Sequence, residues 1–159
     1  HDQITALVMG YMKSLNTSNP QIDVQLLWSL AMLGYGCEEA GAFRSSSFAI
    51  TSDAVYNSLL GLLASTVRGL TPHDLSVAMY SIARLGLSRE PQVDELAGVI
   101  SRKVTHAHAK WDGRSIAGCL CAWALMSSHG CASDELSSMA PALFQAANAL
   151  AKNQGHCSI

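Results

Sequence analysis

The chain has few charged residues, few aromatic residues and no long hydrophobic run. Charged residues make up 14% and aromatic residues 6% of its 159 positions, although 49% of the positions are hydrophobic. No apolar run approaches the roughly 18 residues that a membrane span requires, so we expect no membrane partner. The formal net charge of -2 provides no general attraction for nucleic acid, so binding to RNA would require local clustering of basic side chains.

Motifs for metal binding and catalysis are also missing. The five cysteines are an odd number without zinc-finger or C-x-x-C spacing, a pattern typical of free thiols in a reducing compartment. No four ligands have zinc-site spacing, and no Gly-rich phosphate loop, nucleophile elbow or metalloprotease motif occurs. The spacing therefore predicts no metal site, no cofactor and no catalytic residues, although an acid–base pair such as His73 and Asp74 could still be assembled in space.

One stretch, Leu70 to Leu87, carries the signals of a complete helix. Thr71 is a favourable N-cap, and Pro72 suits the first helical turn. Apolar residues then recur at helical spacing, and Gly86 stands where a left-handed C-cap would end the helix. The apolar stripe consists of Leu75, Met79, Ile82 and Ala83.

The same pattern recurs upstream and downstream. A shift of 52 residues places Asn19-Pro20 on Thr71-Pro72 and Gly34 on Gly86. A shift of 41 residues in the other direction gives a weaker match, in which Asp112 is the cap and Ser127 replaces the closing glycine. Repeated helical hairpins of this length are typical of stacked-repeat proteins.

Between the copies lie further helical patterns and no strand pattern. We expect an all-α fold, an α-solenoid of about three and a half stacked hairpins, with a closed helical bundle as the alternative. The hydroxyl-rich segment 37–52 is predicted to be an inserted loop, and Pro141 to kink or break the last helix. The chain starts without methionine, so we interpret 1–159 as a single helical-repeat segment of a longer protein. The seven predicted helices are 2–15, 20–34, 53–69, 72–85, 91–106, 113–127 and 133–150.

The string from Thr71 to Gly86, with its echo from Leu27 to Gly34, resembles the first helix of the octotricopeptide repeat. It is equally similar to the heptatricopeptide repeats of apicomplexan proteins and to the repeats of FAST-kinase-like proteins, many of which end in a RAP domain. The sequence departs from that pattern in the insertion at 37–52 and in the missing Leu-Gly end of the third copy. No RAP domain lies within these residues.

The resemblance implies an organellar RNA-binding protein without enzymatic activity, in mitochondria or, alternatively, in chloroplasts. It implies a structural or assembly component of a mitochondrial ribosome or related ribonucleoprotein, with ribosomal RNA favoured over messenger RNA and with neighbouring proteins as further partners. A transcript maturation or translation factor is an alternative. Composition alone suits a protein-interaction scaffold without RNA contact equally well.

Two surfaces are candidates for RNA contact. Six of the ten basic residues fall within 31 positions, together with two histidines and a tryptophan in a predicted turn. Such a segment offers cations for phosphates and a ring for base stacking, although basic residues at helix ends often only complement the helix dipole. This first candidate comprises Arg84, Arg89, Arg102, Lys103, His106, His108, Lys110, Trp111 and Arg114. The second candidate is the polar face of the repeat helices, with Gln21, Gln25, His73 and Ser76 beside Arg84 and Arg114.

The four aromatic candidates for stacking differ in their predicted environment. Trp28, Tyr80 and Trp123 lie within helical apolar runs, which favours packing in the core. Trp111 lies in a turn between helices, and we expect it to be the stacking residue.

Overall fold

The structure is a computed structural model that describes Ala6, Gly10 and residues 19–33, 53–107, 110–131 and 133–155. All regular structure in these residues is helical, which confirms the predicted all-α class. The predicted helix 2–15, apart from helical Ala6 and Gly10, and the predicted loop 37–52 lie outside the described residues. The elements are α2 (Pro20–Met32), α3 (Asp53–Thr66), the 3-10 turn η1 (Val67–Gly69), α4 (Pro72–Leu85), α5 (Pro91–Ala107), α6 (Gly113–Ser128) and α7 (Asp134–Gly155).

Helix α4 has the ends that its sequence predicts. The Thr71 hydroxyl accepts a hydrogen bond from the Asp74 N–H (3.2 Å), and the Asp74 carboxylate accepts one from the Thr71 N–H (3.2 Å). This reciprocal capping box satisfies two amides that the first turn leaves without partners. Gly86 ends the helix in the left-handed conformation, with φ of 75°.

The later helices depart from the predicted ends in two places. The third copy does have a closing glycine, because Gly130 takes a φ of 75° three residues beyond the aligned position. The predicted break at Pro141 is wrong, since α7 continues through it to Gly155. Proline removes one hydrogen bond to the preceding turn. Burial of Met139 and Leu143 on either side of Pro141 stabilises the helix across that position.

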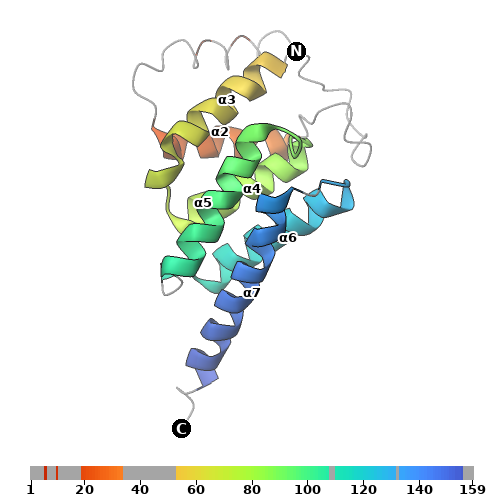
Figure 1. The fold of residues 1–159 in the computed structure, drawn as a ribbon. Helices are drawn as coiled ribbons and strands as arrows, with labels where there is room; N and C mark the ends of the chain where they lie inside the picture. The colour runs from red at the N-terminus through yellow and green to blue at the C-terminus, as the bar shows by residue number, and fades with distance from the viewer. Residues whose placement is uncertain are drawn as a thin grey trace.

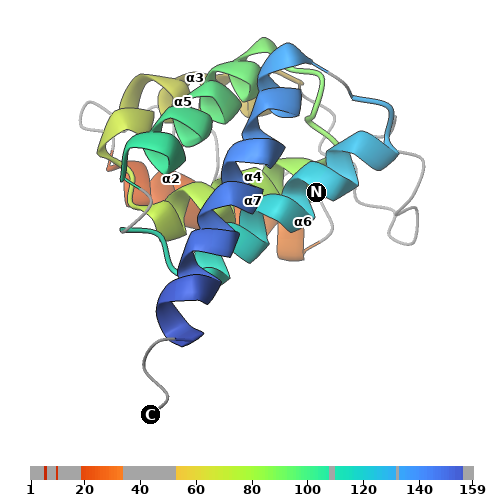
Figure 2. The same cartoon turned by 60° about the horizontal axis from the view of Figure 1, so that its bottom comes forward.

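The helices pack in two rows. In one row α4 lies between α2 and α6, and in the other α5 lies between α3 and α7. Successive helices also contact each other across the rows, as α2 with α3, α4 with α5, and α6 with α7. Figure 1 shows α2 and α3 at one end of the molecule and α7 projecting at the other, and Figure 2 shows α7 crossing α6.

The core lies between the two rows. Leu75, Met79 and Ile82 of α4 are fully buried, as the predicted stripe requires. They belong to one cluster with Leu59 and Leu63 of α3 and with residues of every other described helix. Because both sides of α4 are covered by neighbouring helices, it is the central element of the fold.

Candidate nucleic-acid interface

The turns before α4 and α6 lie side by side at one end of the two rows. Near the end of α5, the Lys103 ammonium donates hydrogen bonds to the carbonyl oxygens of Arg68 (2.8 Å) and Leu70 (2.9 Å), in the turn before α4. The carboxylate of Asp112, the N-cap of α6, interacts electrostatically with His73 in the first turn of α4. These contacts bring the C-terminal ends of η1 and α5 to the N-terminal ends of α4 and α6.

Basic side chains gather at this end, and we call the group the basic rim. Its lysines and arginines are five of the eight in the described residues. The first turns of α4 and α6 add the positive ends of two helix dipoles. All members except the half-buried Lys103 are exposed. The basic rim consists of Arg68, His73, Arg102, Lys103, His106, Lys110 and Arg114.

Two of the acidic side chains near the basic rim act as helix caps, and a third, Glu135, has its carboxylate beside Gly98, where the Arg102 guanidinium also lies. The Asp112 carboxylate accepts a hydrogen bond from the Ser115 N–H (2.7 Å). Hydrogen bonds with Ser115, and then the nearby His73 and Arg114, hold the pKa of Asp112 below its ordinary value. Asp74 is held in the capping box of α4. Both carboxylates lie at helix N-termini, so part of their charge is balanced by the positive ends of the α4 and α6 dipoles.

Lys103 has a structural role within the basic rim. Its two hydrogen bonds satisfy carbonyl oxygens at the end of η1, where the helix has no further amides to offer. Burial, and then the neighbouring Lys110, lowers the pKa of Lys103. The exposed members, Arg102, Lys110 and Arg114, are therefore the stronger candidates for phosphate contact.

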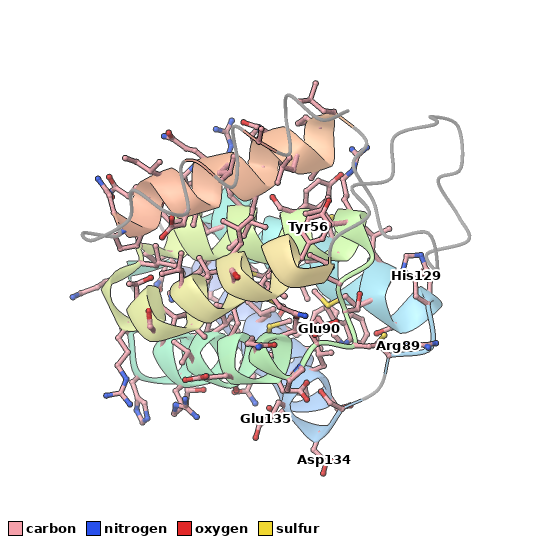
Figure 3. The ribbon with its side chains drawn as sticks, turned by 90° about the horizontal axis from the view of Figure 1, so that it is seen from above. Tyr56, Arg89, Glu90, His129, Asp134 and Glu135 are labelled. Carbon is pink, nitrogen blue, oxygen red and sulfur yellow. The ribbon has the colours of Figure 1, made fainter. Side chains whose placement is uncertain are left out.

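Arg89 lies at the opposite end of the rows, so its predicted grouping with the basic cluster is wrong. It precedes α5, whereas the basic rim includes the C-terminal part of α5. Figure 3 shows Arg89 and Glu90 near His129, on the side where α5 and α7 begin. This end carries five acidic residues, namely Glu90, Asp94, Glu95, Asp134 and Glu135. The described residues thus place most of their basic side chains toward one end and these five acidic side chains toward the other, although Glu135 and Arg102 meet beside Gly98.

The second candidate surface is present as a regular face on α2, α4 and α6. Neighbours within this row and the helices of the other row pack against these helices, and positions spaced i, i+4, i+7 and i+11 remain exposed or half-buried. We call this surface the open face. None of its members is acidic, and its basic members are His73, Arg84 and Arg114. The open face consists of Gln21, Gln25, Trp28, Met32, His73, Val77, Tyr80, Arg84, Arg114, Gly118, Cys121 and Leu125.

Two aromatic residues of the open face contact each other across neighbouring helices. Trp28 of α2 and Tyr80 of α4 have ring centroids 6.1 Å apart and ring planes inclined by 40°. Trp28 is 38% exposed, so the prediction that it packs in the core is wrong. Tyr80 and Trp123 are half-buried and pack against the core, as predicted. The spacing of Trp28 from Gln21 and Gln25 was the sequence signal for its place on the exposed face.

Two predicted contact residues are buried. Trp111 is 2% exposed and belongs to the core cluster, so it presents no free ring for stacking. Ser76 is buried where α4 meets α6, and its Cβ lies 3.2 Å from the position that a Cβ on Gly118 would take. Ser76 therefore packs between helices and is not part of the open face. His108 lies outside the described residues.

Sites for other chemistry are not seen in the described part of the chain. No group of three or more His, Cys, Asp or Glu side chains there could hold a metal ion. Burial raises the pKa of the Cys119 thiol to about 12, so that thiol stays protonated and unreactive at neutral pH. Of the helices α2 to α7, none combines the length and the apolar character needed to cross a bilayer.

Comparisons of the chain with protein-family models, curated proteins and solved structures find no match. The basic rim and the open face therefore have to be interpreted from their own chemistry.

Proposed function

We propose that this protein binds single-stranded RNA through the basic rim and the adjoining open face. The observation that carries the proposal is the gathering at one end of five of the eight lysines and arginines in the described residues. Phosphate groups require exposed cations on one surface, and helix N-termini attract anions as well. The role is one of binding and not of catalysis.

We further propose that the two rows are part of an α-solenoid of the kind that the octotricopeptide resemblance implies. The alternation of helices between the rows, with each hairpin packed on the next, supports this reading. An organellar location and a structural or assembly role in a mitochondrial ribosome, or in a related ribonucleoprotein, belong to the same proposal. The resemblance is the sole support for this part.

A protein-interaction scaffold is a second candidate. It is favoured by two exposed apolar side chains that do not belong to the open face, Ile22 of α2 (43% exposed) and Leu33 (59%), the residue that follows this helix. The two functions are compatible in a ribonucleoprotein, where one surface meets RNA and another meets protein. They differ in salt dependence, because phosphate contacts weaken steeply with added salt and apolar contacts do not.

The test is a fluorescence anisotropy titration of a labelled single-stranded RNA at several salt concentrations. We expect the affinity to fall linearly on a log-log plot, and the slope to decrease by about one for each phosphate that a variant no longer neutralises. Reversal of three exposed rim charges, in the variant Arg102→Glu, Lys110→Glu, Arg114→Glu, should abolish binding.

The matched control compares Arg114→Glu with Arg89→Glu, which changes the net charge equally at the acidic end. Only Arg114→Glu should weaken binding. Unchanged RNA affinity in the folded triple variant would contradict the proposal, and so would an equal loss in Arg89→Glu.

A further inference from the structure

The Trp28–Tyr80 pair is an aromatic surface feature that the core does not explain. Trp28 keeps 38% of its surface exposed, whereas the other described tryptophans pack into or against the core. Its partner Tyr80 belongs to α4 and is half-buried, so one ring of the pair is fixed to the packed part of the fold. A large ring held in place by a second ring loses little conformational freedom when a flat ligand stacks on it.

The open face around the pair holds polar side chains beside apolar ones, and none of its described members is acidic. Gln25 is exposed one helical turn before Trp28, and its amide can donate and accept hydrogen bonds. Arg84 is half-buried one turn after Tyr80. The open face thus combines a ring, an amide and a guanidinium at neighbouring positions of two adjacent helices.

The pair also lies within reach of the basic rim. His73, a member of both surfaces, precedes Tyr80 by two turns of α4, which corresponds to about 10 Å along the helix axis. At about 3.4 Å for each stacked nucleotide, this spans roughly three nucleotides. One strand can therefore place its phosphates on the rim and a base at the pair.

We propose that the Trp28–Tyr80 pair is a stacking subsite for an unpaired nucleobase, with Gln25 beside it to contact the edge of the base. This inference rests on the proposed RNA-binding function and deepens it. Stacking accepts any base, because every base has a π face, so the subsite adds affinity with little sequence preference. Among the described aromatic residues it assigns the stacking role to Trp28, in place of the buried Trp111.

The experiment separates base stacking from phosphate attraction. Two labelled oligoribonucleotides of equal length are titrated at one salt concentration, one of them uridine throughout and the other with every base removed. The wild-type protein should bind the base-containing strand about tenfold more tightly. Trp28→Ala should reduce affinity for that strand by about tenfold and leave the abasic strand unchanged, while Trp28→Phe should retain part of the preference.

Two control variants distinguish the loss of base stacking from other losses of RNA affinity. Phe144→Ala removes another exposed aromatic residue (52% exposed), on α7, and should change neither affinity. Arg114→Glu should weaken both strands equally, because both carry the same phosphates. Circular dichroism of each variant confirms that it is folded.

The failures are distinguishable. Wild-type protein that binds neither strand overturns the proposed function and the subsite with it. RNA binding that depends on Arg114 but not on Trp28 overturns the subsite alone. If Trp28→Ala weakens binding of both strands equally, the subsite is also overturned and the pair has a structural role. If Trp28→Ala abolishes self-association and leaves RNA binding unchanged, the subsite is overturned and the pair makes a protein contact.

Discussion

At the scale of single residues, Asp112 connects helix capping with charge at the basic rim. Its carboxylate accepts the Ser115 N–H at the start of α6 and lies near His73 and Arg114. Removal of a capping oxygen leaves a first-turn amide without a partner. We expect Asp112→Ala to lower the free energy of unfolding at pH 7 by about 1 kcal/mol, as measured by urea denaturation.

The pKa of Asp112 also predicts how this contribution depends on pH. Because the folded protein holds this pKa below the ordinary 3.8, the stabilisation is present above that pH and is lost as the pH falls through the folded-state pKa. Asp112→Asn keeps the capping oxygen but cannot titrate, so its stability should decline less below about pH 4. Equal acid dependence in Asp112→Asn and wild type would contradict this assignment.

At the scale of elements, the contact between α4 and α6 depends on a small residue. Gly118 of α6 faces Ser76 of α4, whose Cβ would lie 3.2 Å from a new Cβ. We expect Gly118→Val to lower the free energy of unfolding by about 1–3 kcal/mol, because the added methyl groups force the helices apart. The control is Gly61→Val, at an exposed position of α3 with nothing within 4 Å, which should be nearly neutral. Equal losses in thermal denaturation would contradict the close approach.

Helix ends were predictable because their chemistry is local. Thr71, Asp74 and Gly86 lie within one short segment, and each acts on backbone groups of its own helix. The helix break predicted at Pro141 is wrong for the opposite reason. Its effect on α7 depends on how strongly the flanking buried residues pack against α5, which the local sequence does not state.

At the scale of the whole molecule, exposure depended on neighbours distant in sequence. A turn position suggested an exposed Trp111, yet the helices around that turn enclose it. An apolar run suggested a buried Trp28, yet α3 and α4 pack against the other side of α2 and leave Trp28 exposed. The basic cluster was predicted in part, because Arg102, Lys103, Lys110 and Arg114 flank one turn. Arg68 was not predicted to belong to the cluster, because its place beside Lys103 depends on a contact between η1 and α5.

The central position of α4 predicts that its core supports the entire described fold. Ile82 is fully buried on a helix that contacts α2, α5 and α6. Ile82→Ala should leave a cavity and lower the free energy of unfolding by about 2–5 kcal/mol, and Leu75→Ala should act similarly. Phe144→Ala, at an exposed position, should change it by less than about 0.5 kcal/mol.

Urea denaturation followed by tryptophan fluorescence and by circular dichroism should show one shared transition if the rows unfold together. The fluorescence signal includes buried Trp111, which reports on the contact of α6 with the rest of the core, while circular dichroism reports on all helices. In Ile82→Ala both signals should shift to lower urea by the same amount. A wild-type transition in either signal would mean that part of the helical array folds without α4, and it would contradict the central role of that helix.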